Sequence, residues 1–323
     1  MPLIQPCTYH PPPLMSNGHF QSVFPTLARR INGVQYVRER IDTPDGDFLD
    51  LDWSRVGSRK VAIVSHGLEG HSRRHYVLGM VRALNAHGWD TCAWNLRGCS
   101  GEPNRTLKFY HSGATYDLET VVNHIRNLNP DMEIALIGFS LGGNLTLKYL
   151  GEQGSAVVPN QIAHAVTFSV PLDLTSSSRK IGHWTNRPYM IRFLRSLHQK
   201  IREKMVLFPH DLSDADYGEI KNFKDFDDRY TAPLHGFKNA EDYWHKCSAK
   251  PELGKISIPT LIVNAQDDPF LPEPCYPVEA AQTNPNLFLE MPSAGGHVGF
   301  MSFNDDGEYW SERRALAFLE IGG

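Results

Sequence analysis

Short apolar runs alternate with amphipathic stretches through most of this chain. The runs are rich in branched residues, as in buried parallel strands, and occupy residues 61–65, 91–94, 134–138, 163–170, 260–264 and 286–290. Apolar residues recur at helical spacing over residues 74–87, 114–127, 144–150 and 309–320. Strands that alternate with helices predict a parallel sheet with right-handed crossovers.

The N-terminal part has a different pattern. Residues 34–37 and 48–53 alternate between apolar and polar side chains, and Pro44-Asp45-Gly46 between them is typical of a turn. These residues predict an antiparallel hairpin at the edge of the sheet. We expect residues 1–33 to form an arm packed on the core, with a short helix near residues 19–30.

The alternation of strands and helices breaks over residues 172–250, which are charged, aromatic and mostly helical in pattern. Residues 194–198 look amphipathic, whereas residues 223–237 have the pattern of a loop. An insertion of this length between sheet strands usually covers the strand ends. The sequence therefore predicts an α/β core of residues 34–171 and 251–323, with a helical cap insertion at residues 172–250.

The composition is that of an ordinary globular protein, with 41% hydrophobic and 21% charged residues. The net charge of −4 and the lack of a long basic run argue against nucleic acid as a partner. The five cysteines are odd in number and form no CxxC pair, which favours a reducing compartment. The N-terminus does not have the pattern of a signal peptide, and no stretch approaches the ~20 apolar residues that span a bilayer. We therefore expect a cytoplasmic protein with no integral membrane segment, and the sequence does not indicate its oligomeric state.

The sequence Gly138-Phe139-Ser140-Leu141-Gly142 lies where an apolar strand meets a helix. A sharp strand-to-helix turn strains the serine, and glycines two residues before and after it avoid clashes. The turn exposes the Ser140 hydroxyl, and the helix N-terminus beside it favours developing negative charge. A glycine-rich turn with an incidental serine would have the same pattern, but the flanking strand and helix favour the nucleophile elbow of the α/β-hydrolases. That fold has a mostly parallel eight-stranded sheet with helices on both faces.

A serine nucleophile needs a base, and the base needs an acid that orients it. In the α/β-hydrolases these residues follow in the order serine, acid, histidine, each in a loop just after a strand. Asp267 and Asp268 both follow the apolar run at residues 260–264. A count of three residues from Ala265, the small residue that ends the strand, favours Asp268. Asp267 would then cap the turn or face solvent.

His297 is the expected base, because it follows the last strand and the glycines around it let its loop reach the serine. An oxyanion hole needs two backbone N–H groups aimed at the developing charge. The residue after the nucleophile, Leu141, supplies one of them. Leu68, in the His66-Gly67-Leu68 loop after the first parallel strand, supplies the other. A tight turn would have the same His66-Gly67 sequence, and the two roles are compatible.

Two other groups of residues have alternative interpretations. His66, Glu69, His71 and His75 could hold a metal ion, but their spacing contains no HExxH motif. Arg97 could bind a carboxylate or phosphate, although we favour a structural arginine that pins its loop. The sequence thus predicts no metal and no cofactor.

The motifs of this chain together resemble those of the YheT-like branch of the α/β-hydrolases, also called AB-hydrolase family 4. The resemblance begins at residues 19–22, extends almost to the C-terminus and rests on residues 65–70, 95–101, 110–113, 138–144, 227–244, 264–269 and 295–300. It implies carboxylesterase-type chemistry on short- and medium-chain acyl esters, with a charge relay of Ser140, Asp268 and His297. Some eukaryotic relatives resemble phospholipases or alcohol acyltransferases.

We therefore expect a serine carboxylesterase that acts on a small-molecule ester through an acyl-enzyme. A serine at the elbow argues against dehalogenase or epoxide hydrolase chemistry, which uses an aspartate there. Acyl transfer to an alcohol, or lipase or phospholipase activity, would use the same triad. A non-catalytic binding protein is disfavoured because all three triad positions are filled. The sequence predicts no substrate-binding residues, because the pocket depends on how residues 172–250 close over the site.

Overall fold

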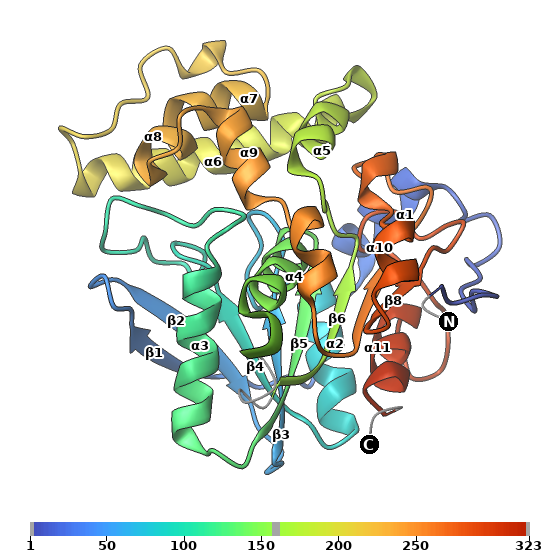
Figure 1. The fold of residues 1–323 in the computed structure, drawn as a ribbon. Helices are drawn as coiled ribbons and strands as arrows, with labels where there is room; N and C mark the ends of the chain where they lie inside the picture. The colour runs from blue at the N-terminus through green and yellow to red at the C-terminus, as the bar shows by residue number, and fades with distance from the viewer. Residues whose placement is uncertain (1–2, 157–161, 321–323) are drawn as a thin grey trace.

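The computed structural model describes residues 3–156 and 162–320, arranged as Figure 1 shows. An eight-stranded sheet has the order β1-β2-β4-β3-β5-β6-β7-β8; β2 is antiparallel to β1 and β4, and the other neighbours are parallel. The strands are β1 (Val37–Asp42), β2 (Phe48–Ser54), β3 (Lys60–Ser65), β4 (Asp90–Asn95), β5 (Glu133–Phe139), β6 (Ile162–Phe168), β7 (Thr260–Val263) and β8 (Leu287–Glu290). The mostly parallel eight-stranded α/β fold expected from the sequence is confirmed. Residues 1–2, 157–161 and 321–323, which the predicted arm and core include, lie outside the described residues.

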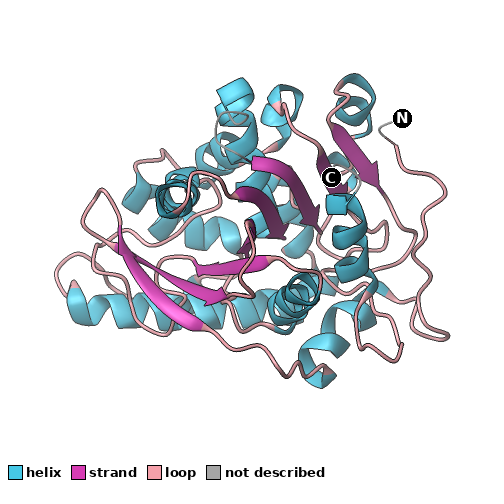
Figure 2. Cartoon of the chain, turned by 90° about the horizontal axis from the view of Figure 1, so that it is seen from below, coloured by secondary structure: helices cyan, strands magenta, loops and turns pink. Residues whose placement is uncertain are grey.

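Helices cover both faces of the sheet (Figure 2). One apolar cluster lies under α3 (Thr115–Leu128), α4 (Leu141–Gln153) and α10 (Val278–Thr283), and the other lies under α2 (His75–Ala86) and α11 (Trp310–Glu320). Within β5, Ile134 and Leu136 point into the first cluster, and Ala135 and Ile137 point into the second. Because both faces are covered, the central strands appear in the sequence as continuous apolar runs.

The predicted edge hairpin is formed by β1 and β2, but its predicted start at residue 34 is wrong. β1 begins at Val37, which pairs with Trp53, one residue before the end of β2. In this register residues 34 and 35 would lie beyond Ser54, the last residue of β2, and therefore have no partner in that strand.

β2 alternates between apolar and polar residues, and the strand is buried throughout. Its polar residues Asp50 and Asp52 lie opposite Arg40 and Arg38 on β1 and form ion pairs with them at 2.7 and 2.8 Å. Cross-strand pairs of opposite charge stabilise a sheet. The two arginines thus cover carboxylates that the pattern alone would place in water.

Residues 172–250, which we call the insertion, connect β6 to β7 and form helices over one end of the sheet (Figure 1). Its elements are α5 (Leu174–Ile181), η2 (Trp184–Asn186), α6 (Arg187–Leu207), η3 (Tyr217–Glu219), α7 (Phe223–Phe226), η4 (Asp227–Thr231), α8 (Ala232–His235) and α9 (Ala240–Cys247), followed by η5 (Lys250–Lys255) and, after β7, η6 (Glu273–Cys275). The loop predicted at residues 223–237 is wrong, because helical turns run from Phe223 to His235. Phe223, Phe226 and Tyr230 are spaced three or four residues apart and are buried in one apolar cluster. Their burial stabilises helical turns that charged and proline residues obscure in the sequence.

The N-terminal segment lies beside β8 and α11, and its helix near residues 19–30 forms as α1 (Gly18–Ala28) (Figure 1). Ile4 donates a backbone hydrogen bond of 2.9 Å to β8. The Tyr9 hydroxyl donates to the Gln21 side chain on α1 at 2.6 Å. These contacts hold α1 close to the loops that follow β7 and β8.

Two further features bear on the expectations from composition. Among the described helices, none combines the length and the apolarity that crossing a bilayer requires. All five cysteines are free thiols.

Arg97 lies in the loop after β4 and has a structural environment. Its side chain is 2% exposed, and its guanidinium contacts Asp117 on α3 and Asp45 in the hairpin turn, each at 2.7 Å. A third carboxylate, Asp47, lies at 3.2 Å. The arginine therefore joins its loop to the hairpin and to α3, in agreement with the favoured interpretation.

Replacement of Arg97 by methionine is expected to lower the free energy of unfolding by about 3 kcal/mol or more, because it leaves the buried Asp117 carboxylate without its partner. Arg105→Met is the matched control. The ion pair of Arg105 with Asp42 is exposed, and such pairs contribute about 0–1 kcal/mol. Urea unfolding of the three proteins measures the losses. Equal losses in both variants would show that Arg97 has no special structural role.

Candidate active site

Ser140 occupies the turn between β5 and α4, with φ 53° and ψ −119°. A positive φ is strained for a residue with a side chain, and strain of this kind clusters at active sites. A Cβ atom at Gly142 would lie 2.4 Å from the backbone oxygen of Ser65, and one at Gly138 would lie 2.6 Å from the Cα of Gly143. Both positions thus require glycine, which explains the Gly-x-Ser-x-Gly pattern.

The structure brings Ser140, His297 and Asp268 together. His297 Nε2 lies 2.9 Å from Ser140 Oγ, and His297 Nδ1 lies 2.9 Å from Asp268 Oδ2. Asp268 is 1% exposed, and its Oδ1 accepts a hydrogen bond from the Phe270 N–H at 2.8 Å. A proton on Nδ1, directed at the carboxylate, leaves Nε2 free to accept the serine proton. The three residues follow β5, β8 and β7, whose carboxyl ends lie at the same edge of the sheet.

Asp267 contacts the histidine loop and not the imidazole. Its Oδ1 accepts a hydrogen bond from the Gly296 N–H at 2.8 Å. Burial raises the pKa of Asp267 above its ordinary value, although this hydrogen bond opposes the shift. The adjacent aspartates therefore face different partners, and Asp268 is the one directed at the histidine.

Leu68 and Leu141, the residues with the predicted oxyanion N–H groups, line the same pocket as Ser140. The loop that carries Leu68 lies against the nucleophile, since a Cβ at Gly67 would be 3.1 Å from the Ser140 Cβ. Within residues 3–156 and 162–320, neither leucine N–H donates a hydrogen bond. Both groups are thus available to a charged oxygen at the serine.

His66 and Glu69 have partners within the protein. His66 Nε2 accepts a hydrogen bond from the Leu96 N–H at 3.1 Å, and His66 Nδ1 donates one to the Gly67 carbonyl oxygen at 2.8 Å. Burial lowers the pKa of His66 to about 3, so the ring is neutral. Glu69 accepts from the Tyr110 hydroxyl at 2.7 Å and pairs with Lys200 on α6 at 3.3 Å. These contacts support the loop of Leu68 and link it to the insertion.

Three residues that the sequence analysis did not assign support the His297 loop. The Ser22 hydroxyl on α1 accepts a hydrogen bond from the His297 N–H at 2.8 Å. The Ser169 hydroxyl after β6 accepts one from the Val298 N–H at 2.9 Å. The Phe270 ring lies 4.4 Å from the imidazole, centroid to centroid. Ser22 belongs to a segment that carries the family resemblance, which is a usable signal. Nothing in the local sequence of Ser169 or Phe270 indicates the contact with a distant loop.

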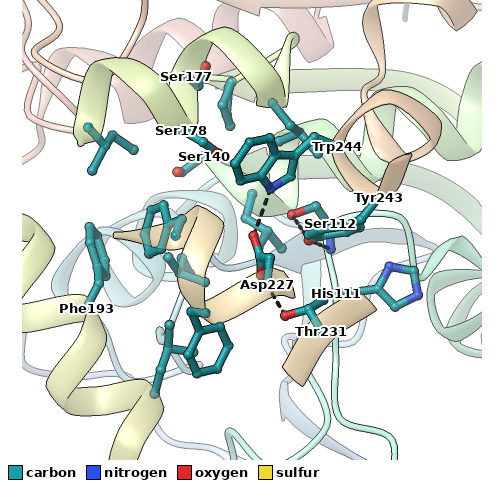
Figure 3. A pocket seen from close by; sticks show the side chains of 18 of the residues that line it. His111, Ser112, Ser140, Ser177, Ser178, Phe193, Asp227, Thr231, Tyr243 and Trp244 are labelled. Atoms are coloured by element: carbon teal, nitrogen blue, oxygen red, sulfur yellow. Dashed lines mark hydrogen bonds between the residues drawn. The ribbon is translucent and has the colours of Figure 1, made fainter. Parts of the chain in front are cut away.

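The Ser140 hydroxyl faces a pocket between the sheet and the insertion, shown in Figure 3. Its walls are mainly aromatic and aliphatic, and include Phe109, Leu174, Phe193, Leu197, Phe223 and Phe226. All of its lining residues are buried or half-buried. The volume of this cavity is about 110 Å³. We call this space the apolar pocket.

A second cavity meets the apolar pocket at Ser140 and His297. It is lined from α1 and α6 by more polar side chains, which include Ser22, Thr26, Tyr189 and the exposed Arg192. The serine and histidine therefore lie between an apolar chamber and a polar opening, which we call the polar cavity.

Asp227 is a carboxyl in the wall of the apolar pocket (Figure 3). It lies in η4, a π-helical turn, and is 9% exposed. Its Oδ1 accepts from the Thr231 hydroxyl at 2.6 Å, and its Oδ2 accepts from the Trp244 indole N–H at 2.8 Å. Burial raises the pKa of Asp227 to about 7, although both hydrogen bonds oppose the shift.

The raised pKa of Asp227 predicts a loss of stability as the pH rises from about 4 to about 7. In this window the carboxyl of the unfolded chain has ionised, whereas the buried carboxyl keeps its proton, so protons favour the folded state. The free energy of unfolding should fall by at most about 1.4 kcal/mol per pH unit in this window. Asp227→Asn removes this titration, so the wild type should lose stability relative to the variant across the window. Urea unfolding at several pH values measures the difference, and a constant difference would contradict the prediction.

The sheet order, with a serine on the turn after β5 and a histidine after β8, is that of an α/β-hydrolase. A family profile described as the alpha/beta hydrolase fold matches residues 62–303. The chain belongs to this family, and within it to the YheT-like branch that its motifs resemble.

Three curated relatives illustrate the membership. YheT of Escherichia coli K12, provisionally named an esterase, is 35% identical over 88% of this chain and 85% of its own length. The phospholipase ABHD3 of Homo sapiens is 31% identical over 91% of this chain and 74% of its own. A monoacylglycerol lipase of Saccharomyces cerevisiae is 30% identical over 92% of this chain and 66% of its own. The chain is thus a hydrolase with relatives of the esterase and lipase type.

A solved structure agrees with the fold. An esterase of Pyrococcus furiosus superposes with a TM-score of 0.61, at 19% identity, over 91% of this chain and 97% of that one. At this identity the likeness concerns the fold alone.

Proposed function

We propose that this chain is a serine carboxylesterase in which Ser140, Asp268 and His297 form the catalytic triad. The proposal rests on the continuous contacts from Ser140 through His297 to the buried Asp268, each 2.9 Å long. The names of the relatives, which are those of an esterase, a phospholipase and a monoacylglycerol lipase, favour an ester as the substrate.

In the proposed reaction, His297 Nε2 takes the hydroxyl proton of Ser140 as the Oγ attacks the acyl carbonyl. Asp268 stays ionised, keeps the proton on Nδ1 and stabilises the imidazolium. The oxyanion of the tetrahedral species accepts from the N–H groups of Leu68 and Leu141; loss of one such donor typically costs about 3–4 kcal/mol. The imidazolium then donates its proton to the leaving alcohol, and the acyl group remains on Ser140.

Water completes the proposed reaction. His297 takes a proton from the water molecule that attacks the acyl-enzyme, and returns it to Ser140 Oγ as the carboxylic acid leaves. The apolar pocket suits the acyl chain, because burial of each methylene contributes about 0.8 kcal/mol. The polar cavity, with the exposed Arg192 in its wall, suits the alcohol and the incoming water.

A panel of p-nitrophenyl esters of rising acyl length tests the proposal. We expect hydrolysis of the short- and medium-chain esters. We also expect a fluorophosphonate probe to label Ser140 in the wild type and to leave the Ser140→Ala variant unlabelled. No hydrolysis across the panel together with no labelling would overturn the assignment in favour of a non-catalytic role. The cytoplasmic location expected from the sequence stays a prediction.

Acyl transfer to an alcohol uses the same acyl-enzyme and differs only in the acceptor. Hydrolysis in the presence of ethanol separates the two reactions, because transfer produces an ethyl ester and hydrolysis produces the free acid. We expect the free acid to predominate.

A further inference from the structure

The apolar pocket contains an unpaired carboxyl. Among the described residues that line the pocket, Asp227 is the sole aspartate or glutamate, and it forms no ion pair within the described part of the chain. The next residue, Asp228, has different partners: it binds Lys224 and accepts from the Ala240 N–H at 2.7 Å. The Asp227 carboxyl is therefore held in an apolar wall with two neutral donors and no cation.

The two hydrogen bonds of Asp227 leave room for a ligand. A carboxylate has about four acceptor sites on its two oxygens. The Thr231 hydroxyl and the Trp244 indole N–H fill two of these sites, one on each oxygen. Both of these donors line the pocket with Asp227, and Figure 3 shows the carboxyl between them. No donor in the described part of the chain fills the remaining sites.

A structural role alone does not explain the choice of aspartate. An asparagine at this position could accept from Trp244 and donate to the Thr231 oxygen, and thus join η4 to α9 without a buried acid. Burial of a carboxyl with no cation costs free energy that an amide avoids. A π-helical turn such as η4 is itself frequent at functional sites. These facts favour a role for the Asp227 carboxyl in binding a ligand.

We propose that the apolar pocket takes an acyl chain that carries a hydroxyl group, and that Asp227 binds this hydroxyl. The inference rests on the proposed esterase function and specifies its substrate class as esters of hydroxylated acids. A hydroxyl group both donates and accepts, so it can bind the ionised carboxyl as a donor and the protonated carboxyl as either partner. A plain alkyl chain would remove water from the Asp227 carboxyl without filling its acceptor sites. A hydroxyl group on the chain would donate a hydrogen bond to one of these sites.

The test compares kcat/KM for pairs of p-nitrophenyl esters of equal chain length, with and without a hydroxyl group, placed in turn at each carbon beyond the second. For at least one hydroxyl position, we expect the wild type to prefer the hydroxylated ester about tenfold or more, as hydrogen bonds to a charged group allow. Asp227→Leu should reduce this ratio to about one. Asp227→Asn, which can keep both internal hydrogen bonds, should lower the ratio in a folded protein even if the leucine variant does not fold. Asp228→Asn is the matched control and should keep the wild-type ratio.

Three results would overturn the inference. They are the absence of any preference in the wild type, an unchanged ratio in Asp227→Asn, and a stronger preference for an ammonium than for a hydroxyl at the same carbon. In each case hydrolysis of the plain esters continues, so the proposed esterase function stands. Failure of that function has a different signature, in which neither plain nor hydroxylated esters are hydrolysed and the fluorophosphonate probe leaves Ser140 unlabelled.

Discussion

Ser140→Ala should lower kcat/KM for a short p-nitrophenyl ester by about 10⁴-fold or more, because the nucleophile of the triad is removed. The remaining N–H groups and pocket can still orient an ester toward water, so a small residual rate is expected. Steady-state kinetics with a single ester measures the change.

The fold should survive this substitution. The backbone of Ser140 keeps its hydrogen bonds, a donation of 2.9 Å to the Phe168 oxygen and an acceptance of 3.0 Å from the Asn144 N–H. An unchanged urea midpoint checks this point. Ser213→Ala, at an exposed serine of the insertion that lines neither cavity, is the matched control and should keep full activity. A Ser140→Ala variant with more than about 1% of wild-type activity would remove Ser140 from the role of nucleophile.

Asp268→Asn should lower activity by about 10⁴-fold. The amide can direct an N–H toward His297 Nδ1, which places the histidine proton on Nε2. Nε2 then cannot accept the proton of Ser140. The packing should change little, because the two side chains have nearly the same shape.

Asp267→Asn is the matched control for this substitution. The asparagine keeps an oxygen that can accept from the Gly296 N–H, which lies 2.8 Å from the native Oδ1. We expect activity within about tenfold of the wild type. Replacing one charged hydrogen bond by a neutral one weakens the interaction by only about 1 kcal/mol. The opposite pattern, with Asp267→Asn inactive and Asp268→Asn active, would mean that the count from Ala265 is one residue out of register.

The residues brought together at the site could be named from the sequence because each has a strong local signal. Ser140 lies between glycines that the elbow geometry requires, since a Cβ at Gly142 would meet the Ser65 oxygen at 2.4 Å. Asp268 and His297 follow strands in the order that the fold class expects. Their 2.9 Å contacts depend on the meeting of three strand ends, which the order of apolar runs already predicts.

The loop predicted at residues 223–237 is wrong because packing decides the local structure there. The burial of β2 is likewise decided by packing, because Arg38 and Arg40 of the neighbouring strand cover its carboxylates. Residues 223–237 have the composition of a loop, but burial of Phe223 and Phe226 stabilises helical turns there. In both cases contacts with other elements decide what the local pattern leaves open.

The sequence by itself determined the α/β-hydrolase class, the alternation of strands and helices along the chain, and the identity of Ser140, Asp268 and His297 as candidates. Periodicity, glycine positions and spacing are local properties of the chain. Only the tertiary structure decided what surrounds the serine. The apolar pocket, the polar cavity and the place of Asp227 in the pocket wall arise where the insertion meets the strand ends. No local pattern encodes these contacts, because they join side chains far apart in the sequence, such as Ser112 and Tyr243 of the insertion, at a separation of 131 residues.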